Sequence, residues 1–424
     1  MPITSEPNSQ SAFGVTPLNS AAPELDRTTN NQSQPWFNGW LVAVCLLFPA
    51  LLTVWYGLDH SWPFWDAADH VRVEFQYAEL LRHARPWNLH WLKEFLTVNY
   101  CYPPTVHIFN GALKAILGNA RWVDSLCLVF FSTILSFSTC ATALLLLKNR
   151  AAAALTVCFI NIYPCVALLS HIKLLDFPHL SLFTLAMFTL LNWQRQPTWS
   201  RAILCGIALG AACTTKQIAS FFLFAPCLLA LLQQLYARRY DRALQLTAAG
   251  AIVVAFLAVW VVPNWHEISG YMHRNSGHLG SRTVSTAFFP NLLGYANCAP
   301  GLTGYPLLAL CLLCLTQARV RQLRSLALPA SASLAGIICM SALPFQLPEH
   351  RYIAPVLLFP ALLCAGQICR FYLEKKQILF AVASFLAVYG AVQFAVLNFS
   401  PYPLELPRPL RHALPRALGP APHV

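Results

Sequence analysis

The chain has 424 residues, of which 57% are hydrophobic and only 10% are charged, and its mean hydropathy is +0.52. A soluble domain must cover its surface with polar groups, so this composition excludes a soluble protein and indicates a membrane protein. The net charge of +12 does not indicate nucleic-acid binding, because much of it lies in short Lys/Arg clusters between apolar runs.

Residues 1–35 are rich in Ser, Asn, Gln, Pro and Thr, which predicts a disordered tail. The tail has no basic segment leading directly into an apolar one, so we do not expect a cleaved signal peptide. Residues 401–424 are rich in Pro and Arg and predict a second disordered tail. Between the tails, residues 36–400 form the predicted transmembrane domain.

Apolar runs long enough to cross a bilayer, about 20 residues each, recur along this domain. In lipid such runs must be helical, since their backbone groups have no water to bond. We therefore predict an all-α polytopic fold with about 11–13 transmembrane helices, and a shorter run at 104–117 that could be re-entrant or interfacial. The runs are 37–57, 122–147, 150–170, 177–193, 200–215, 218–235, 243–263, 291–316, 325–345, 352–371 and 377–398.

Basic residues cluster in alternate loops, which predicts that these loops are cytoplasmic. The clusters are Lys148/Arg150, Arg195/Arg201, Arg238/Arg239/Arg242, Arg319/Arg321/Arg324 and Arg370/Lys375/Lys376. The opposite side then holds Asp66, Tyr102, Lys173, Asp176, Lys216, Glu349, His350 and Arg351.

Two long segments lie on this non-cytoplasmic side. Residues 58–103 mix charged, apolar and aromatic side chains, and we expect interfacial amphipathic helices there. Residues 264–290 are predicted to form a second long loop that carries His and Arg side chains.

The first candidate acids are Asp66 and Asp69, just after the first apolar run. A carboxylate at a partly dry boundary can act as a general base towards a hydroxyl. The competing interpretation is that Asp66 caps the helix that begins near residue 67.

Asp176 precedes Phe177-Pro178 at the start of a later run, which is a strong helix-start pattern. An N-cap role and a functional role remain equally open. A carboxylate at this position could bind a cation or position a substrate hydroxyl.

Three cationic segments could bind phosphate. Lys216 lies in a polar break between two apolar runs, and Arg351-Tyr352 opens another run. A bare turn lysine and an interfacial Arg-Tyr anchor are the competing interpretations. Arg274 and Arg282 could contact phosphate too, or lie in a solvated loop.

Other chemistries find no support in the sequence. The His residues lack tight zinc-ligand spacing. Walker A, dinucleotide and nucleophile-elbow motifs are missing, and the 15 Cys are scattered with no disulfide or zinc framework.

Taken in order, these motifs resemble the GT-C superfamily of membrane glycosyltransferases. The resemblance rests on Asp66 after the first span, Tyr102-Pro103-Pro104, Leu174-Leu175-Asp176-Phe177-Pro178, Thr215-Lys216 and Arg351-Tyr352, and covers roughly residues 37–365. The chain looks most similar to the lipid-A aminoarabinose transferases and protein O-mannosyltransferases, including the rhizobial lipopolysaccharide core transferases.

The resemblance implies sugar transfer from a polyprenyl-phosphate carrier to an envelope lipid, glycan or protein hydroxyl, with inversion. Asp66 matches the family's first acid, the implied base, and Asp176 its second. Lys216, Arg351 and Tyr352 match carrier-phosphate positions.

The chain also departs from the family pattern. Ala67 stands where a second acid often follows Asp66, so Asp69 or His70 could take that role. Gln217 replaces a usual Gly, and Tyr102 replaces a Lys before Pro-Pro.

We therefore expect a multi-pass enzyme of the bacterial inner membrane with its site facing the periplasm. No cofactor is firmly indicated, although a divalent cation is an option. The alternatives are a lipid flippase or solute transporter, and a non-catalytic envelope-assembly subunit.

Overall fold

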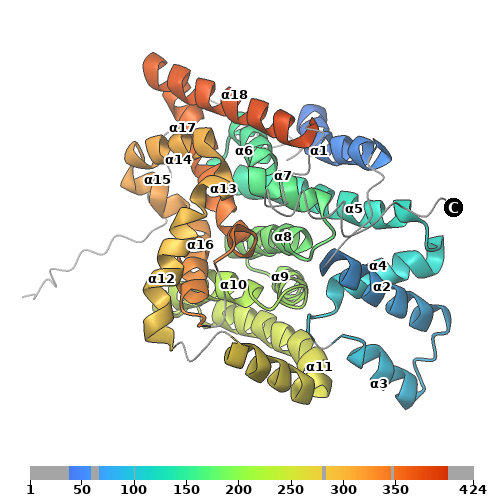
Figure 1. The fold of residues 1–424 in the computed structure, drawn as a ribbon. Coiled ribbons are helices and arrows are strands. Elements are labelled where there is room, and N and C mark those ends of the chain that lie inside the picture. Colours follow the sequence, from blue (N-terminus) through green and yellow to red (C-terminus); the bar gives the residue numbers. More distant parts are fainter. Residues whose placement is uncertain (1–37, 59–65, 100, 279–282, 345–347, 400–424) are drawn as a thin grey trace, which may run out of the picture. The chain divides into compact units, whose positions relative to one another are not determined.

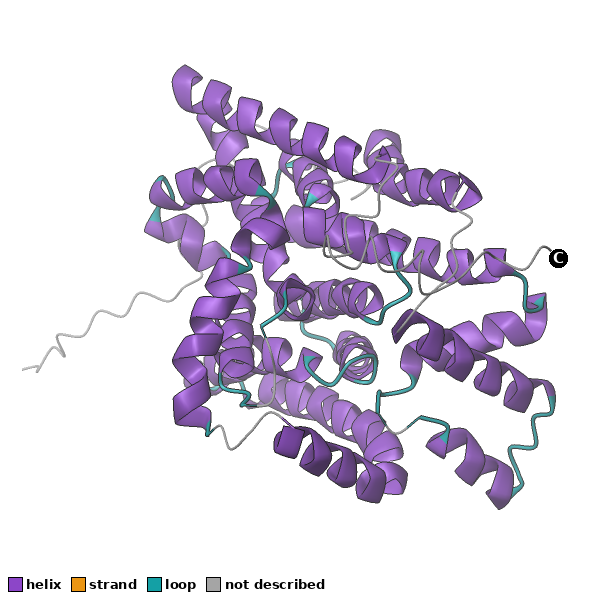
Figure 2. Ribbon diagram, in the orientation of Figure 1, coloured by secondary structure: helices purple, strands orange, loops and turns teal. Residues whose placement is uncertain are grey.

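The structure is a computed structural model that describes residues 38–58, 66–99, 101–278, 283–344 and 348–399. The chain divides into two units, Met1–Asn38 and Gly39–Val424, and the helices of the described residues belong to the second. The described residues form helices and short connections without a strand, so the predicted all-α fold is confirmed (Figure 2).

The helices of the first half are given in Figure 1 in blue and green. They are α1 Gly39–Leu58, α2 Asp66–Arg82, α3 Leu89–Thr97, α4 Thr105–Leu117, α5 Arg121–Leu147, α6 Arg150–Ile162, α7 Pro164–His171, α8 Asp176–Arg195 and α9 Trp199–Cys213.

The second half runs from green to red in the same view (Figure 1). Its elements are α10 Ala219–Tyr236, α11 Tyr240–His278, α12 Val284–Asn297, α13 Ala299–Thr303, α14 Tyr305–Thr316, α15 Val320–Ser325, α16 Ala327–Ser341, the 3₁₀-helix η2 His350–Leu357, α17 Leu358–Leu373 and α18 Gln377–Phe399.

Six helical segments of the described chain are long and apolar enough to cross a membrane, or up to eight if two bent pairs are each one span. The expected 11 to 13 spans therefore include runs that form shorter or less apolar helices, such as α9 and α16. The multi-pass character predicted from hydropathy is confirmed.

Two predicted spans are broken. The run at 150–170 bends by 63° between α6 and α7, where Pro164 starts the second helix because it has no N–H to continue the first. The run at 291–316 bends by 110° before α14. Gly304 makes this turn with a φ of +73°, a conformation that other residues adopt only with strain.

The first long segment contains the expected amphipathic helices, α2 and α3. Helix α2 buries Ala67, His70, Val73, Glu74, Tyr77 and Ala78, a stripe at helical spacing that packs against α4. The two helices approach so closely at Gly111 that a Cβ there would lie 2.6 Å from Cβ of Tyr77.

The second long segment, 264–290, is not mainly an irregular loop. Helix α11 continues to His278 and α12 begins at Val284. The indole of Trp260 donates to the carbonyl of Asn99 at 3.0 Å, and the Asn264 amide donates to the carbonyl of Leu96 at 2.8 Å. These bonds attach α11 to the end of α3, which explains why the helix persists beyond its apolar part.

Helix α8 lies at the centre of the bundle and contacts α5, α9, α10 and η2 (Figure 1). Its buried side chains lie on all sides of the helix, as expected for a central position. Asp176 is its first residue, so this central helix begins at a candidate site residue.

Candidate active site

Asp66 is the first residue of α2, and about half of its side chain (48%) is exposed. One of its carboxylate oxygens lies 3.5 Å from Nη1 of Arg351, which η2 carries. The structure therefore brings together two predicted residues from opposite ends of the helical domain.

The Arg351 guanidinium is oriented by two further contacts. Its Nε donates to the carboxylate of Glu349 at 2.6 Å, and its Nη2 donates to the Tyr352 hydroxyl at 3.0 Å. An arginine has five N–H donors, so these contacts and the ion pair with Asp66 leave donors for a further anion.

Asp176 is buried and accepts a hydrogen bond from Nζ of Lys216 at 2.5 Å. Leu175, and not Asp176, stands at the N-cap of α8, and no side chain caps this helix end. Asp176 is therefore not the N-cap of α8, and its carboxylate pairs with the amine of Lys216.

Lys216 lies in the turn between α9 and α10, and its side chain is buried. Burial lowers the pKa of Lys216, while the Asp176 carboxylate opposes this by favouring the charged amine. The Lys216 Nζ lies 4.6 Å from the centre of the Tyr352 ring, and Cζ of Arg351 lies 4.9 Å from the same centre. Two cations therefore flank one aromatic ring.

Tyr102 approaches this cluster through the loop before α4. The backbone N–H of Thr105 donates to the carbonyl of Thr214 at 3.1 Å, and their hydroxyls are 2.7 Å apart. These bonds hold the Tyr-Pro-Pro loop beside the turn of Lys216. Burial raises the pKa of Tyr102, so its phenol stays protonated and can donate a hydrogen bond.

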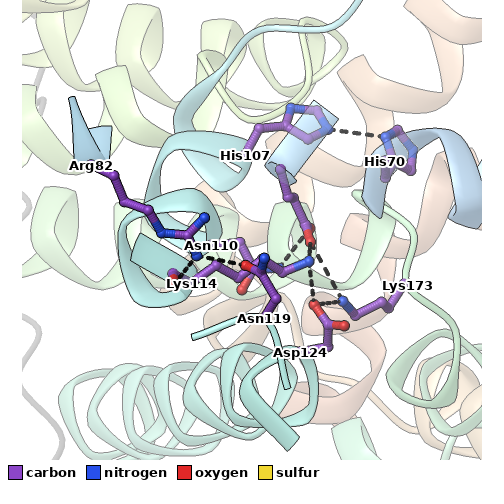
Figure 3. A network of polar contacts seen from close by, with 9 residues as sticks. His70, Arg82, His107, Asn110, Lys114, Asn119, Asp124 and Lys173 are labelled. Carbon is purple, nitrogen blue, oxygen red and sulfur yellow. Dashed lines mark hydrogen bonds and ion pairs between the residues drawn. The ribbon is translucent and has the colours of Figure 1, made fainter. Parts of the chain in front are cut away.

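His70 lies one turn after Asp66 on the same face of α2. Its ring packs edge-on against Tyr102 with 5.2 Å between centres, and its Nδ1 is 3.0 Å from Nε2 of His107 (Figure 3). Burial lowers the pKa of His70, and it lowers the pKa of His107 to about 3. Both imidazoles are therefore neutral near pH 7.

The structure does not bring every predicted residue to this cluster. Asp69 is exposed and forms a surface ion pair with Arg72 at 3.5 Å. Arg274 lies on α11, but its side chain is outside the described part of the chain, as is the whole of Arg282. The residues that do converge are Asp66, His70, Tyr102, Asp176, Lys216, Arg351 and Tyr352.

Sequence reasoning missed two groups here. Glu349 orients Arg351. In the sequence, its position just before a helix start is the only feature that could have indicated this role. His179 lies one turn after Asp176 and is fully buried, and neither ring nitrogen has a hydrogen-bond partner among the described residues. The only available signal for His179 was its spacing of three from Asp176.

The charges of the cluster are nearly balanced. Asp66, Asp176 and Glu349 are negative, and Lys216 and Arg351 are positive. Each cation is already paired with a carboxylate, so an incoming anion would have to compete with these acids.

The described side chains can be compared with the ligand sets that hold metal ions. Among them, no group of three or more His, Cys, Asp or Glu residues is arranged to hold a metal ion. The Asp176 carboxylate is paired with Lys216.

Comparisons with known proteins give one family match and several structural likenesses. Residues 102–275, fewer than half of the 424, match the family model of dolichyl-phosphate-mannose-protein mannosyltransferases. This segment includes Tyr102, Asp176 and Lys216. No curated protein matches the chain.

Among solved structures, the Archaeoglobus fulgidus oligosaccharyltransferase in complex with Zn and sulfate is 13% identical with a TM-score of 0.52; the match covers 84% of this chain and 52% of that one. ArnT from Cupriavidus metallidurans bound to undecaprenyl phosphate is 17% identical with a TM-score of 0.48, and the match covers 85% of this chain and 70% of that one.

The oligosaccharyltransferase likeness concerns the fold, and this chain spans about half the length of that protein. The family match concerns a segment that carries three of the seven converging residues. Neither favours the flippase or transporter alternative. The helical fold and the family match over residues 102–275 agree with the resemblance inferred from the sequence.

Proposed function

We propose that the chain transfers a sugar from a polyprenyl-phosphate carrier to a hydroxyl of an envelope lipid, glycan or protein. The observation that carries this proposal is the pair of cations on one ring, Lys216 and Arg351 beside Tyr352, with Asp66 next to Arg351. A carrier phosphate needs cations, and an acceptor hydroxyl needs a base. The name of the matching family also specifies a polyprenyl-type phosphosugar donor.

In this reaction the phosphate of the donor is held by Lys216 and Arg351, with a hydrogen bond from the Tyr102 phenol. The acceptor oxygen attacks the anomeric carbon, and the bond from that carbon to the phosphate oxygen breaks. The electron pair leaves with the polyprenyl phosphate, which needs no acid catalyst because the cations stabilise its charge. Asp66 takes the hydroxyl proton. In-line attack inverts the anomeric configuration.

The other predicted residues have narrower roles in this proposal. Asp176 favours the charged form of Lys216 and holds its amine in place, which is a positioning role. His70 is better located than Asp69 to replace the second acid, because it faces Tyr102 while Asp69 faces outward. We assign no step to a metal ion, and Arg274 and Arg282 remain candidates for phosphate contact.

The test of this function is Asp66→Asn, with a panel of polyprenyl-phosphate sugars as donors. Loss of the base should lower transfer by about a hundredfold to ten-thousandfold. Binding of the carrier lipid should not weaken, because the substitution removes an acid that competes for Arg351, and the melting temperature should stay unchanged, because Asp66 is half exposed. Asp69→Asn, on the same helix, is the matched control and should retain activity. Full activity of Asp66→Asn would show that Asp66 is not the base and would contradict the proposed mechanism.

We also propose that the site faces the periplasm of a bacterial inner membrane, as the positive-inside distribution indicates. Fusion of alkaline phosphatase after Lys173 should be active and fusion after Lys148 inactive. The reverse pattern would refute this orientation.

A further inference from the structure

Four charged side chains form a closed cluster beside the site, which we call the buried network (Figure 3). They are Glu74 of α2, Lys114 of α4, Asp124 of α5, and Lys173 in the connection between α7 and α8. Nζ of Lys114 is 2.9 Å from Glu74 and 2.8 Å from Asp124. Lys173 contacts the same two carboxylates.

The buried network is shielded from water and balanced in charge. The Lys114 and Glu74 side chains are 0% and 5% exposed, and those of Lys173 and Asp124 are 12% and 16% exposed. The Asn110 amide adds a hydrogen bond to Glu74 at 2.6 Å. Burial raises the pKa of Glu74, but the two lysines outweigh it and hold this pKa below its ordinary value, so the carboxylate stays ionised.

The buried network joins the two chain segments that carry the site acids. Glu74 lies eight residues after Asp66, about two turns further along the same face of α2, with His70 between them. Lys173 lies three residues before Asp176. Contact between Glu74 and Lys173, at 3.5 Å, therefore ties the segment of the base to the segment that holds Lys216.

Stability alone does not account for four charges in this place. A buried ion cluster is generally no more stabilising than apolar side chains of the same volume, because desolvation offsets the attraction. It does impose one geometry, since each lysine must meet both carboxylates at once. Apolar packing would allow α2 to slide or rotate against the α7–α8 connection.

We propose that Glu74 and Lys173 are positioning residues, which set the placement of Asp66 relative to the Asp176–Lys216 pair. This inference rests on the proposed function, because it assumes that transfer depends on both acids. A displacement of about 1 Å at a reacting group can cost about a hundredfold in rate.

Two double variants test the proposal with equal changes in charge. Glu74→Gln/Lys173→Met removes the link between α2 and the α7–α8 connection and leaves the Lys114–Asp124 pair intact. Lys114→Met/Asp124→Asn removes the same number of buried charges but leaves the Glu74–Lys173 link. Each variant loses one positive and one negative charge.

The first variant should lower kcat by about thirtyfold to a hundredfold, with KM for the donor unchanged. The second should lower kcat by about threefold or less at a matched loss in melting temperature. Equal losses of kcat at equal melting temperature would overturn the proposal and leave only a structural role. Should the first variant fail to fold, Lys173→Gln alone should lower kcat to a smaller degree and leave KM unchanged. A wild-type kcat in Lys173→Gln would overturn the proposal.

A readout without turnover separates this inference from the proposed function. Amide hydrogen exchange over residues 66–82 should become faster in the first variant and stay unchanged in the second. Wild-type protein that transfers no sugar would refute the proposed function, whereas the exchange comparison would still decide whether the Glu74–Lys173 link positions α2. Unchanged exchange in both variants would overturn the inference.

Discussion

Two ionic clusters each include one acid of α2, Asp66 in the site and Glu74 in the buried network, and the clusters differ in accessibility. In the site, Asp66 and Arg351 form one contact at 3.5 Å, with 48% and 23% of their side chains exposed. In the buried network, Lys114 is fully buried between two carboxylates. The accessible pair can exchange its partner for a ligand, because water can solvate the acid left behind. The buried network cannot, so it suits a fixed role.

We expect the largest effect on stability from Lys114→Met, which removes one cation of the buried network. It leaves Glu74 and Asp124 with only Lys173, and loss of one partner from a buried ion cluster costs about 3–5 kcal/mol in free energy of unfolding. Thermal unfolding in detergent, followed by intrinsic fluorescence, measures the effect. A melting temperature equal to that of the wild type would show that the network is not buried.

Arg351→Met should show the opposite behaviour. Asp66 and Glu349 remain partly hydrated, so the free energy of unfolding should change by less than about 1 kcal/mol. Loss of a charge-assisted contact of about 1.5–3 kcal/mol to the phosphate should weaken binding of polyprenyl phosphate by about tenfold to a hundredfold. Binding of radiolabelled carrier lipid tests this, with the surface variant Arg72→Met as control. Unchanged binding would show that Arg351 does not contact the carrier phosphate.

A smaller effect concerns pH and the His70–His107 pair. Burial lowers the pKa of His107 from 6.5 to about 3, so the unfolded chain binds a proton more readily than the folded one. The stability that depends on neutral His107 is then fully present above pH 6.5 and is lost as pH falls towards 3, with a slope of up to about 1.4 kcal/mol per pH unit.

Unfolding measured from pH 7 to pH 5 should thus be steeper for the wild type than for His107→Gln. An equal dependence of stability on pH in the two proteins would show that His107 is not neutral in the folded state.

Some of the site could be predicted from sequence because its signals are local. The stripe of α2, with Asp66, His70 and Glu74 one turn apart, follows from helical spacing. The late Arg351-Tyr352 is recognisable because an arginine at a helix start opposes the helix dipole. Positive-inside clustering places these residues with Lys216 and Asp176 on one side independently of any contact between them.

Other features depend on contacts between distant segments. Lys114 lies 40 residues from Glu74, in a short apolar run where a lysine has no periodic signal, so its two acid partners were not predictable. The extension of α11 to His278 follows from side-chain bonds of Trp260 and Asn264 to the α3 region. Hydropathy also could not show the bends at Pro164 and Gly304 that divide two apolar runs.

The amino-acid sequence by itself determined that this chain is an all-α membrane protein with acids and cations on one side of its spans. Apolar run length and charge distribution suffice for that, because the bilayer acts on each segment separately. Only the tertiary structure decided which acid meets which cation: Asp66 with Arg351, Asp176 with Lys216, and Glu74 with Lys114 and Lys173. Those pairings require segments far apart in sequence to pack together, and that depends on side-chain fit rather than on any local pattern.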